Sequence, residues 1–276
     1  MPLLITVLFF LTSIFCYLTD KKKLSLCFLV ITGLTLRLWI ISLDPFLHDW
    51  DERFHALVAK NLITHPFKPM LWLNPVSDYD PSAWCCNHIW LHKQPLFLWQ
   101  MALSLKLFGI SEIAVRIPSM IMGTLLIFFI YDIAFYWTKN ALCAFVSAVF
   151  ICFSYYHLEL ISGRLSLDHN DLAFCFYLTT ALWAWIKYIK HDLKLNKWLW
   201  LTGFFLGCAV LIKWLTAFVL IGGWGLYILN DRKLRTDTTK YLHLILSIIL
   251  SCLIFLPWQI FIKLKYPLES SLSYHH

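Results

Sequence analysis

The pattern of hydrophobic and polar positions divides the chain into long apolar segments separated by short polar ones. A membrane-spanning helix needs about 20 predominantly apolar residues. The segments that approach or exceed this length are Leu3–Leu18, Leu24–Leu43, Ile113–Trp137, Ala141–Ile161, Leu172–Ile189, Trp198–Leu229 and Tyr241–Ile262. The sixth is long enough for two short helices broken near Lys213, with Gly222, Gly223 and Gly225 helping the second to pack closely. The pattern predicts an all-α, polytopic membrane protein with about eight transmembrane helices.

Two further segments are apolar on one side only. Pro95–Gly109 is short for a span and carries Gln100 and Lys106, so it is typical of a helix that lies along the membrane surface. The amphipathic segment Glu52–Ile63 precedes it. Together they predict surface helices that form a lid over a lipid-facing cavity.

Composition agrees with a membrane environment. Hydrophobic residues make up 60% of the 276 residues and charged residues 14%, whereas soluble domains have about 45–50% and about 25%. A soluble fold of this size could not bury so much apolar surface, so membrane lipids are the expected surroundings. The net charge of +7 would indicate nucleic acid in a soluble protein, but basic cytoplasmic loops explain it here, and we expect no nucleic-acid partner.

The basic residues also predict the orientation. They cluster at Lys21–Lys23, at Lys139, between Lys187 and Lys197, and between Arg232 and Lys240. All four clusters can be cytoplasmic only if Trp198–Leu229 crosses the membrane twice. The outer segments are then residues 44–112, residues 163–171 and the turn near Lys213. Most acidic residues fall in these segments, so we expect any chemistry at the outer face of a single domain, 1–276.

The first outer loop opens with Asp51, Glu52 and Arg53. Carboxylates directly after a spanning helix are costly near lipid unless they are paired or functional. They can also simply cap the surface helix that begins there, because carboxylates favour helix N-termini. Both interpretations stay open on this pattern alone.

Three cations stand at helix entries or ends. Lys93 precedes Pro95 at the start of a surface helix, where it could hold a lipid phosphate or extend to the interface as an anchor. Arg116 follows Glu112 by one helical turn, a spacing that usually gives a salt bridge. Lys213 ends an apolar helix, again as an anchor or an anion ligand.

The second outer segment carries Asp168 and Asp171. Asp171 could cap the next helix, whereas Asp168 is harder to explain structurally. In the first loop, Cys85, Cys86, His88 and His92 could in principle hold zinc, but their spacing matches no closed zinc pattern. A catalytic divalent metal ion that uses His92 is the more plausible metal site.

The order of these motifs is distinctive. The motifs are the Asp51-Glu52 pair, Lys93-Gln94-Pro95-Leu96, F-G-x-x-E-x-x-x-R-x-P-S from Phe108 to Ser119, the Asp-bearing second loop, and G-x-A-x-L-x-K from Gly207 to Lys213. This series resembles the GT-C membrane glycosyltransferases, in particular the dolichyl-phosphate-mannose–protein mannosyltransferase-like branch that includes the bacterial aminoarabinose transferases of lipid A. The resemblance covers roughly Asp44 to Phe218.

The resemblance implies a donor sugar on a polyprenyl phosphate and a lipid, glycan or protein acceptor at the periplasmic face of the bacterial inner membrane. It implies that Asp51 is the catalytic carboxylate, with Glu52 beside it, and that Lys93 meets the donor phosphate. The remaining residues that it places near the donor or the catalytic centre are Arg116, Lys213 and either Asp168, which we favour, or Asp171. Residue chemistry adds Arg53 as a phosphate ligand and predicts inversion in a single displacement.

The sequence also departs from the family pattern. The usual Lys-Pro-Pro is Lys93-Gln94-Pro95, and the acidic residue that often precedes the lysine is His92, which puts a family-like metal site in doubt. An additional helix precedes the first catalytic loop. Relatives continue beyond the equivalent of His276, so we expect this chain to lack their C-terminal helices and periplasmic domain.

The competing function is a transporter or flippase for a lipid-linked substrate. Transporters bury charges in the middle of helices and often pair two broken helices. Here the charges avoid helix centres and crowd one face, which favours an interfacial enzyme.

Overall fold

The computed structural model describes residues 1–74, 78–80, 88–164 and 168–274, and its regular secondary structure there is helical. It divides into two compact units, residues 1–53 with 103–179 and residues 54–102 with 180–276. Three helices contribute to both units: α3 (Asp51–Leu62), α4 (Pro95–Phe108) and α8 (His169–Lys190). The surface helices α3 and α4 begin and end within one residue of the predicted segments. Each unit is described by itself below.

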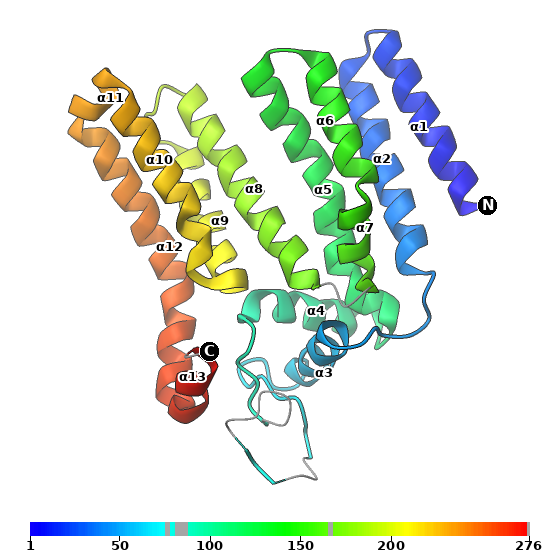
Figure 1. Cartoon of the computed structure of the whole chain (residues 1–276), viewed down its shortest axis with the longest axis vertical. Helices are drawn as coiled ribbons and strands as arrows, with labels where there is room; N and C mark the ends of the chain where they lie inside the picture. The colour runs from blue at the N-terminus through cyan, green and yellow to red at the C-terminus, as the bar shows by residue number, and fades with distance from the viewer. Residues whose placement is uncertain (75–77, 81–87, 165–167, 275–276) are drawn as a thin grey trace. The chain divides into compact units, whose positions relative to one another are not determined.

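The first unit is a bundle of α1 (Pro2–Leu18), α2 (Lys22–Ile41), α5 (Glu112–Thr138), α6 (Ala141–Phe153) and α7 (Tyr155–Ser162), joined by the start of α8 (Figure 1). Helices α2 and α5 run in opposite directions. Arg116 near the start of α5 binds the carbonyl of Ile41 at the end of α2, and Ile127 lies against Gly33. The C-terminus of α2 and the N-terminus of α5 therefore meet at one end of the unit.

Helices α6 and α7 meet at a sharp bend. Their axes differ by 41°, and the hydroxyl of Ser154 at the break accepts the backbone N–H of His157, which caps α7. The guanidinium of Arg37, fully buried in α2, donates to the carbonyls of Ile151 and Cys152 at the end of α6. Carbonyls that have no partner within their helix are thus satisfied where the break would otherwise leave them in lipid.

In the second unit, α9 (Lys197–Lys213) and α12 (Thr238–Lys265) pack side by side in the same direction. Gly203 lies against Ser247, and Gly207, one turn later, lies against Ser251 and Ile254. Because both helices run the same way, the chain between them must return to the starting side. It does so through the 3₁₀ helix η2 (Trp214–Phe218), α10 (Val219–Asn230) and α11 (Arg232–Thr236).

The predicted break at Lys213 is therefore confirmed, but the glycine prediction was wrong. A Cβ atom built on Gly222, Gly223 or Gly225 would meet no atom within 4 Å among the described residues. The glycines that allow close packing are Gly203 and Gly207 of the preceding helix. Helix α13 (Pro267–Tyr274) completes this unit.

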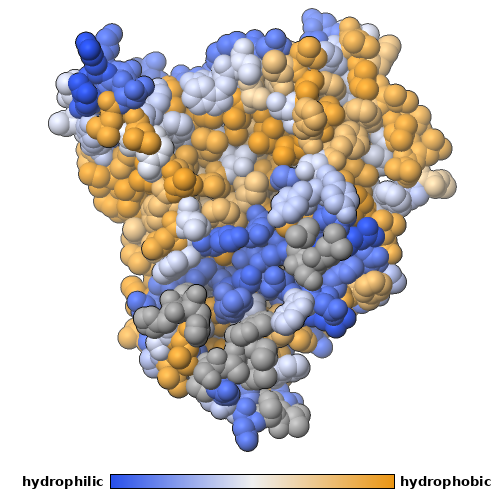
Figure 2. All heavy atoms as spheres, viewed as in Figure 1, coloured by the Kyte–Doolittle hydropathy of each residue, from blue (hydrophilic) through white to orange (hydrophobic). Residues whose placement is uncertain are grey.

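The helices carry the apolar surface of an integral membrane protein. By length and composition, five helical segments within the described residues can cross a membrane, and there are six if the bent pair of α6 and α7 is one span. The predicted eight also include α1, which has 17 residues, and the return through α10. Large apolar side chains are exposed along one face of α12, at Leu242, Ile245, Ile249, Leu253, Leu256, Ile260 and Leu264. Hydrophobic residues cover much of the helical surface in Figure 2, as lipid contact requires.

Candidate active site

The residues predicted to act chemically in the first unit gather at one end, where α2, α5 and α7 finish or start. Arg116, on the second turn of α5, is fully buried there. Its five N–H donors are all used: two bind the carboxylate of Glu52, and three bind the backbone carbonyls of Ile41, Asp44 and Phe46. A guanidinium has only five such donors. The predicted contact of Arg116 with a donor phosphate therefore has no N–H group left to make it.

Glu52 is the acceptor at the centre of this cluster. Its carboxylate receives Arg116 Nε at 2.7 Å, His169 Nε2 at 3.2 Å and the backbone N–H of His48 at 2.6 Å. Burial alone would raise the pKa of Glu52, but the hydrogen bonds from His169 and Arg116 outweigh it and lower the pKa from 4.5 to about 2. Glu52 is thus a buried carboxylate beside Asp51 with a lowered pKa, and its predicted catalytic role stays a prediction.

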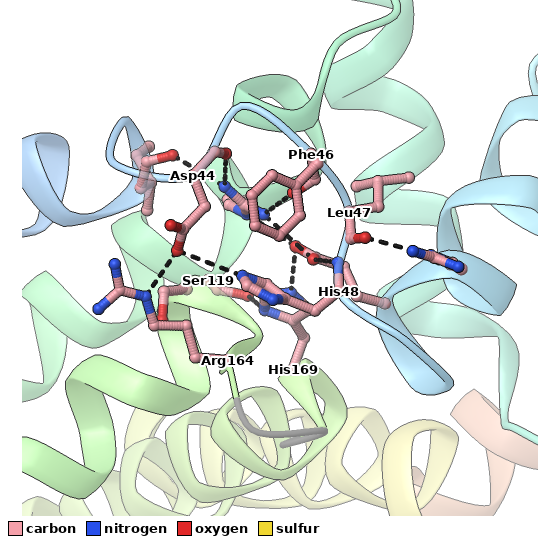
Figure 3. A network of polar contacts seen from close by, with 12 residues as sticks. Asp44, Phe46, Leu47, His48, Ser119, Arg164 and His169 are labelled. Atoms are coloured by element: carbon pink, nitrogen blue, oxygen red, sulfur yellow. Dashed lines mark hydrogen bonds and ion pairs between the residues drawn. The ribbon is translucent and has the colours of Figure 1, made fainter.

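A second group of charges lies at the edge of this cluster (Figure 3). Arg164 Nε donates to Asp44 Oδ2 at 2.6 Å, and His48 Nε2 lies 3.3 Å from the same oxygen. The hydrogen bond from Arg164 lowers the pKa of Asp44 and in return raises that of Arg164. These contacts tie the segment after α2 to the segment after α7, because Arg164 directly follows α7 and Gly163.

The two predicted aspartates come from these two loops and lie close together. Asp51 is the first residue of α3, and Asp168 immediately precedes α8. Their carboxylate oxygens lie within 4.8 Å of one another, and both side chains are partly exposed. Asp168 Oδ1 also accepts the backbone N–H of Asn170 at 2.8 Å, so Asp168 caps α8. The capping role predicted for Asp171 belongs to Asp168, and Asp171 lies in the first helical turn.

The remaining predicted cations occupy different places. Arg53 is exposed and pairs with Asp49 at 2.7 Å. Lys93 lies in the second unit, partly buried, two residues before α4, and Lys213 is exposed at the end of α9. His92 is exposed beside the ring of Trp90, with 5.6 Å between ring centroids. Cys85 and Cys86, considered as zinc ligands, lie outside the described residues.

Four functional neighbours were not predicted: Asp44, His48, Arg164 and His169. Asp44, His48 and Glu52 follow one another at intervals of four residues, but Arg164, which binds Asp44, lies 120 residues away in the sequence. His169 could have been suspected from the sequence, because it directly follows the predicted site residue Asp168. Only the fold shows that its ring contacts Glu52.

Comparisons with known proteins identify the family and support the fold. Residues 92–261, more than half of the chain, match the family described as dolichyl-phosphate-mannose-protein mannosyltransferase. The chain belongs to this family.

This mannosyltransferase-family chain is also similar to one curated protein in sequence and to two crystal structures in fold. An uncharacterized protein of Aquifex aeolicus (strain VF5) is 27% identical over 173 residues, which are 63% of this chain and 31% of that protein. Crystal structures of ArnT from Cupriavidus metallidurans, in the apo state and bound to undecaprenyl phosphate, are 19% identical with TM-scores of 0.61 and 0.59. They cover 87% and 86% of this chain and 42% of ArnT. The likeness shows a shared polytopic GT-C fold, and the chain spans less than half the length of these relatives.

Proposed function

We propose that the chain is a membrane glycosyltransferase that moves a sugar from a polyprenyl-phosphate carrier to an acceptor at the outer face of the bacterial inner membrane. The observation that carries this proposal is the pair Asp51 and Asp168, held within 4.8 Å in a chain of the mannosyltransferase family. The fold shared with ArnT, which has been crystallised bound to undecaprenyl phosphate, supports the choice of carrier. The basic loops support the orientation, with the outer end of the first unit facing the periplasm.

The chemistry requires a base and a stabilised leaving group. Asp51 takes the proton of an acceptor hydroxyl while the hydroxyl oxygen bonds to the anomeric carbon of the sugar. The bond from that carbon to the phosphate oxygen breaks, and polyprenyl phosphate leaves with the electron pair. A single displacement of this kind inverts the anomeric configuration. Asp168, fixed as the cap of α8, orients the acceptor or the base.

The leaving phosphate needs positive charge but little acid catalysis, since it is already a good leaving group. We assign this role to Lys93, with Lys213 and Arg53 as further candidates, and we omit Arg116 because Glu52 and three carbonyls use its donors.

A divalent metal ion also fits the residues present. Mg²⁺ is typically held by one or two carboxylates together with substrate phosphates, and Asp51 and Asp168 offer such a pair. When bound, the ion would neutralise phosphate charge. Participation of His92 as a ligand stays a prediction. Removal of metal with a chelator, followed by addition of Mg²⁺ or Mn²⁺, tests whether sugar transfer needs the ion, and the same experiment on a His92 variant tests whether His92 binds it.

The test is sugar transfer from radiolabelled polyprenyl-phosphate donors by the wild type, Asp51→Asn and Lys93→Ala in detergent. Asp49→Asn is the matched control, because Asp49 is a neighbouring, exposed acid that forms an ion pair with the exposed Arg53. We expect Asp51→Asn to lose about 100-fold or more in kcat, as loss of a general base does. We expect Lys93→Ala to weaken donor use and Asp49→Asn to stay near the wild type. Near-wild-type transfer by Asp51→Asn with intact donor binding would refute the assignment of the base. Gradient-dependent movement of the donor without transfer would favour the flippase.

A further inference from the structure

A buried hydrogen bond joins the chain neighbours of the two aspartates. Glu52 directly follows Asp51, and His169 directly follows Asp168. His169 Nε2 lies 3.2 Å from Glu52 Oε1, and both side chains are fully buried. The distance between Asp51 and Asp168 is therefore set by a contact one residue away from each of them.

The orientation of the imidazole ring is fixed from both sides. On one side of the ring, His169 Nε2 lies 3.2 Å from Glu52 Oε1, an oxygen that also accepts a hydrogen bond from Arg116 Nε. On the other side of the ring, Ser119 Oγ lies 3.1 Å from His169 Nδ1. Ser119 is itself fully buried on α5, one turn after Arg116. The ring therefore cannot rotate without losing a buried hydrogen bond, which is costly.

Ser119, His169 and Glu52 have the connectivity of a nucleophilic triad, but the arrangement does not suit nucleophilic catalysis. All three side chains are at most 1% exposed, so the hydroxyl of Ser119 cannot reach a substrate. The carboxylate is also already neutralised by the buried Arg116. This geometry suits fixing a position.

Gly163 provides an independent observation for the same conclusion. Its φ of +70° is one that side chains rarely adopt, and an added Cβ would lie 2.7 Å from His169 Nε2 and 2.8 Å from Glu52 Cδ. The backbone that leaves α7 thus passes directly against the His169–Glu52 hydrogen bond. Three segments, the starts of α3 and α8 and the end of α7, are packed around this one contact.

We propose that His169 and Ser119 are positioning residues that hold Asp168 against Asp51 through the buried carboxylate of Glu52. The proposal rests on the proposed function for its kinetic consequence, but the geometry itself can be measured without any activity. His157 offers a matched control in the same unit. Its Nδ1 lies 3.1 Å from Ser154 Oγ, the same distance as in the His169–Ser119 pair, at the break between α6 and α7.

The activity-independent experiment uses the double variant Asp51→Cys, Asp168→Cys treated with a short bifunctional methanethiosulfonate. The cross-linked peptide is quantified by mass spectrometry in this background alone, with His169→Leu and with His157→Leu. We expect His169→Leu to slow cross-linking several-fold and His157→Leu to leave the rate unchanged. Equal rates in all three proteins would overturn the proposal. If His169→Leu does not fold, Ser119→Ala gives the same comparison.

The kinetic experiment compares the wild type, His169→Leu and His169→Gln, with activities normalised to the fraction that binds polyprenyl phosphate. A displacement of about 1 Å can cost about 100-fold in rate, so we expect kcat to fall by that order in His169→Leu while the donor KM changes little. His169→Gln, which keeps an N–H near Glu52, should recover most of the rate. If His169 had a merely structural role, less His169→Leu protein would fold, but the folded fraction would keep a normal kcat. That result would overturn the proposal, and so would a kcat of His169→Gln as low as that of His169→Leu. If the wild type transfers no sugar but cross-linking depends on His169, the proposed function fails and the positioning contact stands.

Discussion

At the scale of single residues, the buried ion pair of Arg116 with Glu52 lies at the end of the first unit that carries the candidate site. Removing one partner of a buried ion pair leaves the other charge without compensation and costs about 3–5 kcal/mol. Arg116→Ala would also release three backbone carbonyls. We expect it to lower the thermal unfolding temperature in detergent markedly. Arg53→Ala, which breaks an exposed pair with Asp49, should change that temperature little. Similar unfolding temperatures for the two variants would contradict the role of the buried pair.

Glu52 also predicts a pH dependence. Its pKa in the folded state is about 2, below the ordinary 4.5. The ionised carboxylate therefore contributes its full stabilisation above about pH 4.5 and loses it as the pH falls towards 2, with about 3 kcal/mol at stake. Glu52→Gln should flatten unfolding curves measured between these pH values. Some dependence should remain, since the pKa of Asp44 is lowered as well. A variant with the same acid sensitivity as the wild type would be inconsistent with this assignment.

Several of the candidate site residues could be identified from the sequence, but their hydrogen-bond and ion-pair partners could not. The carboxylates at Asp51, Glu52 and Asp168 were identifiable because charges beside a spanning helix need a reason. The helical spacing suggested Glu112 as the partner of Arg116, yet the ion pair forms with Glu52, 64 residues away. Local periodicity describes neighbours on one helix, whereas this contact depends on how α2, α3 and α5 pack.

At the scale of secondary-structure elements, glycine content alone did not show which helices touch. Gly222, Gly223 and Gly225 lie close together in the sequence, as small residues at a helix interface often do, but an added Cβ at each would meet open space. The boundaries of α3, α4 and α9 were predictable to within one residue, since apolar runs and helix-breaking positions determine them, whereas α12 extends three residues beyond each end of the predicted Tyr241–Ile262. Which face of a helix meets another was not, because a lipid-facing side and a packed side are both apolar.

The packing of α9 against α12 gives a prediction that uses two glycines of the second unit. In Gly207→Ala the new methyl group would lie 2.6 Å from Ile254 Cβ and 2.9 Å from the carbonyl oxygen of Ser251. Such overpacking costs about 1–3 kcal/mol, so the unfolding temperature should fall. Gly222→Ala meets no neighbour within 4 Å and should leave it unchanged or raise it slightly, because alanine favours a helix over glycine. A larger loss in Gly222→Ala than in Gly207→Ala would contradict this packing.

At the scale of the whole molecule, the alternation of apolar spans and basic loops was the most predictable property. The cost of placing charged groups in hydrocarbon acts on every segment, so it leaves a strong pattern in the sequence. In the first unit the carboxylates of the candidate site lie at the end away from Lys21–Lys23 and Lys139, whereas Asp20 pairs with Lys22 at the other end. The membrane topology decides on which side of the membrane the candidate site lies, so a test of sidedness bears on both.

The decisive segment for sidedness is Lys197–Asn230, which by length alone could cross the membrane once. The parallel packing of α9 and α12 instead requires two crossings with the turn at Lys213. Single cysteines at Lys194, Lys213 and Arg235 should then react differently with a membrane-impermeant maleimide, detected by peptide mass spectrometry on intact and opened vesicles. We expect Lys213→Cys to react from the outside, and Lys194→Cys and Arg235→Cys only after the vesicles are opened. With a single crossing, residues 194 and 235 would react from opposite sides, and residue 213 would be shielded by lipid. That pattern would also exclude Lys213 from the outer face, where we propose that the donor phosphate binds.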